Sequence, residues 1–246
     1  MSEISYDQVP YAIRDDLIAA QRRCWEGLAR AGTWHDGARR VAIAAETRNA
    51  RNCDYCQAQK AALSPNAVAG SHAGLGELSD VEVDAVHRIA SDPARLSKAW
   101  YEENKAEGLG DEPYVELVSL VAIVTIVDSF TFALGLPDHP LPTPVPGAPT
   151  RYRSPGAKVQ AAWVPIVEPR DMTESDGDLY PSARVGYIQR AISAVPDSKW
   201  AYWDLASCHY LPMEEIPRWD TNARAIDRTQ IELIAGRVSA LHQCLY

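Results

Sequence analysis

Two cysteines separated by two residues, Cys53 and Cys56, form the clearest chemical pattern in this 246-residue chain. At the start of a helix this spacing places the two sulfurs within bonding distance, and the positive end of the helix dipole stabilises a thiolate. A thiolate attacks a peroxide oxygen to give a sulfenic acid, which the neighbouring thiol converts to a disulfide. The pair therefore predicts redox chemistry.

Two other interpretations of the pair stay open. Half of a zinc site has the same spacing, but a structural zinc site usually adds a second Cys-x-x-Cys or a pair of histidines. Neither is present in the sequence, although Cys208-His209 could supply one from a distance. The pair could also be structural and inert. We expect neither a metal nor a cofactor.

The overall charge argues against nucleic acid as a partner. The formal net charge is -9, and no stretch concentrates Lys and Arg into a basic patch. The N-terminus has no basic start and no apolar core, so we expect no signal peptide. Five cysteines are an odd number in a chain too long for a disulfide scaffold, so the thiols are expected to be reduced and the protein cytoplasmic.

The most apolar run, residues 115–134, predicts a buried helix rather than a membrane span. It contains Glu116 and Asp128, and a bilayer would admit each carboxylate only at a cost of a few kcal/mol. Buried, the two carboxylates would need partners and could line a polar pocket. We favour the alternative that both lie where the helix meets solvent at its ends.

Helical periodicity dominates the chain, and sustained strand-like alternation is absent. The sequence therefore predicts an all-α fold. Longer helices are expected over about 8–32, 35–51, 79–90, 94–106, 112–134, 182–194, 199–210 and from 227 onward, and further helices begin near Cys53 and at Ser64-Pro65. Ser79 and Glu82 have the spacing of a capping box.

A run of seven prolines in residues 137–155 is the clearest boundary in the sequence. Such a run cannot continue a helix and favours extended chain. We expect a helical domain over 1–136, a proline-rich connector over 137–159, and a second helical part over 160–246.

Three stretches resemble one family. AIAAETRNARNCDYCQAQKAALSP is similar to the core of AhpD-like alkylhydroperoxidases, and YVELVSLVAIVTIVDSFTFALGLP resembles the long helix with a Gly-Leu-Pro stop in the same carboxymuconolactone-decarboxylase-like, peroxidase-related group. In DRTQIELIAGRVSALHQCLY, Glu232 precedes Cys244 by twelve positions, the family's spacing from its Glu to its first Cys. The resemblance implies an AhpD-like helical bundle with a second, incomplete helical repeat after the proline-rich connector.

The resemblance also implies a thiol peroxidase mechanism. Cys56 would attack the peroxide and Cys53 would resolve the product, while a Glu on the preceding helix and a His after the pair form a proton relay. Glu46 is the candidate acid. It lies seven residues before Cys53, close to two helical turns, so a continuous helix would place both on one face.

Two positions depart from the family pattern. Val41 stands where the family has its Glu, and Lys60 stands where it has the relay His. A lysine cation can lower a nearby thiol pKa, but it is a poor proton shuttle at neutral pH. His72 could replace the missing histidine only if its loop folds back, and a surface histidine is the simpler expectation.

The second repeat contains only one of the two cysteines. The sequence ends at Tyr246, one residue before a second cysteine would follow Cys244. A degenerate structural repeat is the explanation we favour. A truncated reading frame, and a selenocysteine codon read as a stop, stay open.

Together these patterns predict a thiol-dependent hydroperoxide reductase, an antioxidant oxidoreductase. Its substrate would be a small hydroperoxide, its reductant a thioredoxin-like or lipoyl-linked protein, and its assembly a homo-oligomer; neither nucleic acid nor a membrane is expected as a partner. The alternative is a catalytically degenerate carboxymuconolactone-decarboxylase-like protein with a binding, redox-sensing or assembly role. A lactone lyase is a weaker third candidate.

Overall fold

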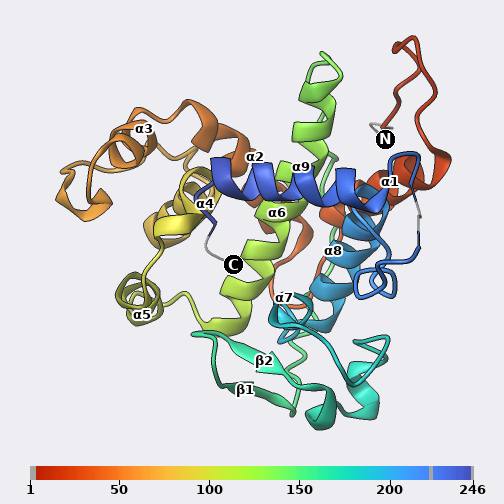
Figure 1. The fold of residues 1–246 in the computed structure, drawn as a ribbon. Coiled ribbons are helices and arrows are strands. Elements are labelled where there is room, and N and C mark those ends of the chain that lie inside the picture. Colours follow the sequence, from red (N-terminus) through yellow and green to blue (C-terminus); the bar gives the residue numbers. More distant parts are fainter. Residues whose placement is uncertain (1–3, 222–223, 245–246) are drawn as a thin grey trace.

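A long helix, α6 (Asp111–Ala133), runs through the middle of the structure (Figure 1). The computed structural model describes residues 4–221 and 224–244. α6 is apolar on nearly all sides, as is typical of a helix surrounded by protein, and Leu117, Leu120 and Val124 are fully buried. Among the described helices only α6 is long and apolar enough to cross a membrane, and most of that apolar stretch is buried inside the protein.

The end of α6 is set by a glycine motif. Gly135 adopts a positive φ of 72°, which lets its N–H bond to the carbonyl of Phe132 at 2.9 Å. The N–H of Leu136 then bonds to the carbonyl of Thr131 at 3.1 Å, which completes a Schellman motif. The predicted Gly-Leu-Pro stop is confirmed.

Most of the other long helices share one core with α6, whereas Asp54–Ala61 contributes no residue to that core and packs on Asp80–Ser91 instead. In Figure 1, α1 and α8 lie on one side of α6, and α3, α4 and α5 lie on the other. The bounds are α1 (Asp15–Ala29), α2 (Gly37–Asn49), α3 (Asp54–Ala61), α4 (Asp80–Ser91), α5 (Lys98–Ala106) and α8 (Pro196–His209). Side chains cap several of these helices: Asp36 accepts the N–H of Arg39 at 2.8 Å, and Ser79 and Glu82 form the predicted capping box.

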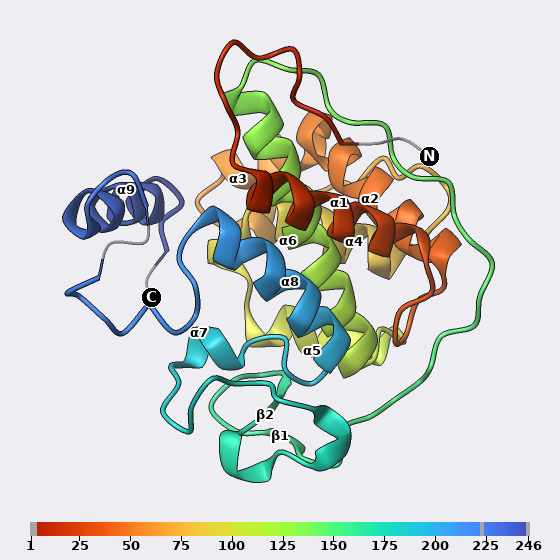
Figure 2. The same cartoon turned by 90° about the vertical axis from the view of Figure 1, so that its right-hand side faces the viewer.

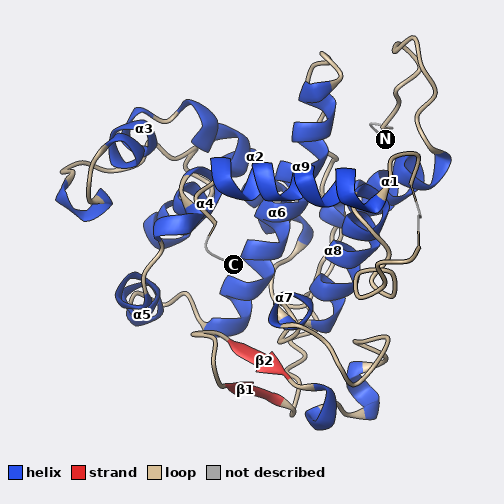
Figure 3. Cartoon of the chain, in the orientation of Figure 1, coloured by secondary structure: helices blue, strands red, loops and turns tan. Residues whose placement is uncertain are grey.

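The proline-rich segment leads to a small antiparallel sheet and then back to the main core. β1 (Ala157–Val159) pairs with β2 (Pro165–Val167), at the bottom of Figure 3, and the short helix α7 (Tyr187–Arg190) follows. Leu205 of α8 is buried in the same core as α1 and α6. The chain after the prolines therefore contributes to the core around α6. The internal repeat that the resemblance implies stays a prediction.

The last helix, α9 (Arg228–Leu241), stands apart from the helical body (Figure 2). Ile231 is buried, but the apolar side chains of Leu233, Ile234, Val238 and Leu241 are exposed. Asp227 caps its first turn by accepting the N–H of Gln230 at 2.9 Å, so the helix start near residue 227 is confirmed.

The mostly helical fold is confirmed, but two expected helices are largely missing. The segment after Ser64-Pro65 forms only a short 3-10 turn, because the chain reaches Gly70 at a φ of 144°, which a helix cannot contain. Residues 182–194 form only α7, because Gly186 precedes it and Ile192 adopts a φ of 68° soon after it. The short sheet was not predicted, because its two strands of three residues each are too short to show sustained alternation of apolar and polar residues.

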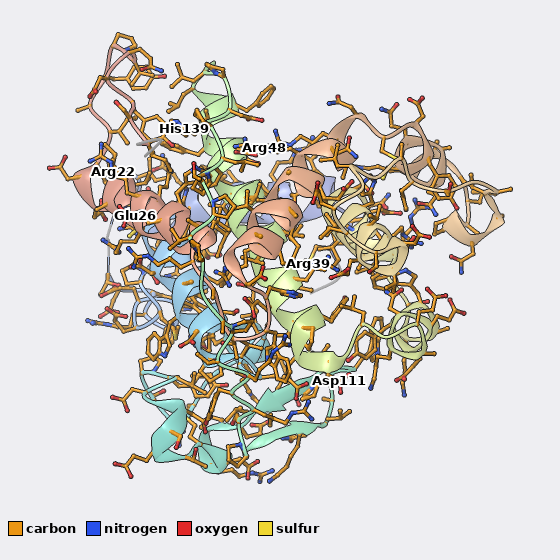
Figure 4. All side chains as sticks on the ribbon, turned by 180° about the vertical axis from the view of Figure 1, so that it is seen from behind. Arg22, Glu26, Arg39, Arg48, Asp111 and His139 are labelled. Carbon is orange, nitrogen blue, oxygen red and sulfur yellow. The ribbon has the colours of Figure 1, made fainter. Side chains whose placement is uncertain are left out.

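Glu116 and Asp128 of α6 are both buried, so the favoured placement at solvent-exposed helix ends is wrong. Glu116 pairs with Arg40 of α2. Asp128 receives two hydrogen bonds from Arg48, at 2.8 and 2.9 Å, and also pairs with Arg51. Arg48 lies at the end of α2 next to α6 (Figure 4). The charges are tolerated because each carboxylate meets a guanidinium as α2 packs on α6.

Candidate functional site

The cysteine pair lies at the N-terminus of α3, as predicted. Cys53 is the residue before the first helical turn, and Cys56 lies within that turn. The other end of the helix is held by Arg95, which donates to the carbonyls of Gln59 at 2.9 Å and Ala62 at 2.7 Å. Since those carbonyls have no partner within the helix, Arg95 fixes α3 against the segment that follows α4.

Two histidines converge on the sulfurs. The Nδ1 atom of His87, on α4, lies 3.2 Å from the Sγ of Cys56. The Nδ1 atom of His72, on the loop between α3 and α4, lies 3.4 Å from the Sγ of Cys56 and 3.6 Å from the Sγ of Cys53. All four atoms lie within 4.8 Å of one another. The loop therefore folds back over the thiols.

A carboxylate lies behind each histidine. The Nε2 atom of His87 is 2.7 Å from Oε1 of Glu46, and Nε2 of His72 is 3.2 Å from Oδ1 of Asp84. Because each carboxylate accepts the Nε2 proton, Nδ1 of each ring is directed to the sulfur as the atom that exchanges a proton with it. The site thus contains a buried Glu46–His87–Cys56 chain and a second, Asp84–His72 pair beside it.

Neutral donors hold both carboxylates in place. Glu46 accepts hydrogen bonds from the side-chain amide of Asn49 at 2.8 Å and from the backbone N–H of Leu75 at 3.0 Å. Asp84 accepts one from the indole N–H of Trp100 at 2.6 Å. Burial opposes ionisation of Glu46, but these bonds and the one from His87 outweigh it and lower the pKa of the carboxyl group. Both acids are therefore anchored as anions.

The histidines favour the thiolate form of the cysteines. Burial raises the pKa of Cys56, but hydrogen bonds from His72 and His87 outweigh it, and the pKa falls to about 6. For Cys53, burial is again outweighed, by the backbone N–H of Cys56 and by His72, and the pKa is lowered. Cys56, which both histidines contact, is therefore mostly thiolate at neutral pH.

The same interactions favour the imidazolium form of the histidines. Burial lowers the pKa of His72, but hydrogen bonds to Asp84 and the cysteines prevail and raise it to about 10. For His87, bonds to Cys56 and Glu46 likewise outweigh burial and raise the pKa. These shifts favour protonated imidazoles and negatively charged sulfurs in the reduced site.

The pH dependence of thiol modification tests this charge distribution. In reduced, metal-free protein, we expect the modification rate of Cys56 by a small thiol reagent to be half-maximal near pH 6, rather than near the ~8.5 of an ordinary thiol. Since the folded-state pKa is lowered, the reactive thiolate is present above pH 6 and is lost as the pH falls below it. Peptide-resolved mass spectrometry measures each cysteine separately.

Cys24 provides the internal control for that experiment. Burial raises its pKa to about 12, so it should stay unmodified at neutral pH. A Cys56 profile centred near that of an ordinary thiol would contradict the thiolate–imidazolium arrangement.

Of the five residues predicted around the cysteine pair, four lie in the site and Lys60 does not. Glu46 is buried there, although it contacts His87 rather than the cysteines, and a 3-10 turn (Ala50–Asn52) interrupts the expected continuous helix. His72 contacts both sulfurs, so the expectation of a surface histidine is wrong. Lys60 is exposed in the last turn of α3 and is not part of the cluster.

The residues of the predicted second repeat lie outside the cluster. Glu232 on α9 accepts a hydrogen bond from the hydroxyl of Tyr210 at 2.7 Å and pairs with Arg228 at 2.8 Å. Cys244 is exposed beyond the end of α9. Neither therefore supplies a group to the four-residue cluster.

Sequence reasoning missed His87 and Asp84. They lie three residues apart on α4 and so share one face of that helix. The capping box at Ser79 fixes where α4 begins, and His87 falls within a run that is otherwise largely apolar. A titratable histidine within such a run is the feature of the sequence that could have indicated a functional role for His87.

No family model matches the chain, and no curated protein or solved structure matches it.

Proposed function

We propose that the protein reduces a small hydroperoxide, with Cys56 as the nucleophile and Cys53 as the resolving thiol. The observation that carries this proposal is the buried chain from Glu46 through His87 to the sulfur of Cys56. A nucleophile in contact with a base that is oriented by a third group is the general arrangement for activating a thiol. His87 supplies the relay histidine that is missing at Lys60.

In the first step the Cys56 thiolate attacks the outer oxygen of the peroxide. A sulfur–oxygen bond forms and the oxygen–oxygen bond breaks, leaving a sulfenic acid on Cys56 and an alkoxide. The protonated His87 gives its Nδ1 proton to the alkoxide, which leaves as the alcohol. Glu46 stabilises the imidazolium before that transfer.

In the second step the Cys53 thiolate attacks the sulfur of the sulfenic acid. A disulfide forms, the sulfur–oxygen bond breaks, and hydroxide leaves as water after it takes a proton from His72, which contacts both sulfurs. The two sulfurs already lie within 4.8 Å of each other. The pair loses two electrons and the peroxide gains them.

The burial of the pair supports a small substrate. Cys56 is 2% exposed and Cys53 is 6% exposed, so a peroxide must pass the loop that contains His72. Regeneration requires thiol–disulfide exchange, for which we propose a thioredoxin-like or lipoyl-linked reductant. We also propose a homo-oligomer, whose interface would cover the exposed apolar residues of α9.

A stoichiometric oxidation tests the function. Reduced, metal-free protein is treated with hydrogen peroxide or with tert-butyl hydroperoxide, and its thiols and intact mass are followed. We expect the loss of two thiols per chain and a mass decrease of about 2 Da, the signature of one disulfide. Cys56→Ser should abolish the reaction, whereas Cys208→Ser, which changes a thiol on α8, should not.

A further variant separates the first step of the reaction from the second. Cys53→Ser should leave a sulfenic acid on Cys56 that a dimedone-type reagent traps. Thiols that persist in excess peroxide would contradict the proposal and favour the binding, redox-sensing or assembly alternative.

A further inference from the structure

The four atoms that converge in the site have the geometry of a metal-binding set. In tetrahedral zinc, with Zn–S of about 2.3 Å and Zn–N of about 2.0–2.1 Å, neighbouring sulfur and nitrogen ligands lie about 3.5 Å apart. The sulfur–nitrogen distances here are 3.2 Å from Cys56 to His87, 3.4 Å from Cys56 to His72 and 3.6 Å from Cys53 to His72. Little movement is needed to place an ion between them.

We propose that the reduced protein binds one Zn²⁺ through Cys53, Cys56, His72 and His87, and that zinc binding and peroxide reduction exclude each other. The competition rests on the proposed function; the metal site itself does not. The ion and the peroxide would use the same sulfur of Cys56.

The groups behind the ligands fit a zinc site. A metal-bound histidine usually donates its other ring N–H to a carboxylate, which fixes the ring and increases its basicity as a ligand. Both histidines have such a partner, Glu46 for His87 and Asp84 for His72. These two carboxylates support the assignment, because a Cys-x-x-Cys pair alone would not require a carboxylate behind each histidine.

The charges also balance. Without metal, two thiolates and two carboxylates face two imidazolium ions, for a net charge of about -2 when all are ionised. Zn²⁺ displaces the two Nδ1 protons, and the net charge of the site stays the same. Binding the ion therefore adds no uncompensated charge to a buried site.

The ligand set selects zinc and suggests its role. Two thiolates and two imidazoles in a tetrahedron suit zinc, whereas magnesium and calcium prefer oxygen ligands. Four protein ligands leave no position for an activated water, so the ion would not act as a hydrolytic centre. Instead it would shield both thiolates from oxidation.

Oxidation would release the ion. The balanced reaction converts the zinc dithiolate, one hydroperoxide and two protons into the disulfide, Zn²⁺, the alcohol and water. A disulfide no longer carries the anionic sulfurs that bind zinc. The site would then change between a zinc-bound, protected form and a metal-free, peroxide-reactive form.

Metal titration of the full chain tests the site. Metal-free, reduced protein is titrated with Zn²⁺, and with Co²⁺ as a coloured substitute. We expect one ion per chain and, with Co²⁺, tetrahedral ligand-field bands with sulfur-to-cobalt charge transfer that Cys53→Ser weakens. Asp84→Asn should lower the zinc affinity ~10–100-fold, because it removes a carboxylate behind a ligand. Asp80→Asn changes an exposed acid on the same helix and should leave the affinity unchanged.

The peroxide reaction is then measured with and without bound zinc. Slower oxidation of the zinc form, with release of the ion as the disulfide appears, supports the inference. Failure to bind Zn²⁺, or a cobalt spectrum without sulfur ligation, would overturn it even if the metal-free protein reduces peroxide. Zinc binding by a metal-free protein that is inert to peroxide would overturn the proposed function and the competition, and would support the metal site alone.

Discussion

Replacing His87 with glutamine is expected to slow the oxidation of Cys56 by hydrogen peroxide ~10²–10⁴-fold, the usual contribution of a positioned acid–base group. His87 is the buried residue that links the sulfur to Glu46. Glutamine preserves much of the side-chain volume and can still donate to the carboxylate, but it cannot deliver a proton to the departing alkoxide. The loss should therefore appear in the rate of oxidation rather than in the stability of the fold.

The measurement is the second-order rate of sulfenic acid or disulfide formation in metal-free protein, read by stopped-flow fluorescence or quenched mass spectrometry. His209→Gln is the matched control: His209 is a half-buried histidine on α8 whose ring contacts Gln21, outside the site. Equal rates for His87→Gln and the parent protein would exclude His87 from proton transfer and leave the peroxidase mechanism without its relay.

Replacing Glu116 with alanine is expected to lower the free energy of unfolding by ~3–5 kcal/mol, the usual cost of breaking a buried ion pair from one side. The change leaves the guanidinium of Arg40, whose side chain is 11% exposed, without its carboxylate. It also removes the acceptor for the backbone N–H of Trp34, which lies 2.5 Å from Oε2 of Glu116. Both groups would stay buried without compensation.

Urea unfolding followed by circular dichroism measures this loss, and the thermal midpoint should fall by on the order of 10 °C for a chain of this size. Glu26→Ala is the control: Glu26 is exposed on α1 (Figure 4), and its loss should change stability by less than ~0.5 kcal/mol. A change at Glu116 no larger than the one at Glu26 would show that the buried pair contributes little to the fold.

The sequence predicted the parts of the structure that depend on local interactions. The capping box of Ser79 and Glu82 predicts the start of α4, and Gly135 predicts the end of α6. The Cys-x-x-Cys spacing predicts that Cys53 lies at the start of a helix. Each of these features is made by residues within a few positions of one another. Local spacing contains enough information to identify them.

The parts that were missed depend on how distant segments pack. His87 reaches Cys56 across 31 positions, and Arg48 reaches Asp128 across 80. The sequence shows that α6 contains carboxylates, but which helix brings the arginines is decided by the packing of α2 on α6. For the same reason the spacing after Cys56 does not reveal the histidine that contacts its sulfur, because His87 comes from another helix, α4.

The two oxygens of Glu46 have different neighbours. One accepts from the ring of His87, and the other accepts from the backbone N–H of Leu75, on the loop that covers the thiols. Any motion that lifts this part of the loop breaks a bond to the carboxylate that contacts His87. Deuterium exchange at the Leu75 amide therefore measures how readily the loop over the sulfurs opens: its protection gives the free energy of that opening under native conditions, without substrate or catalysis.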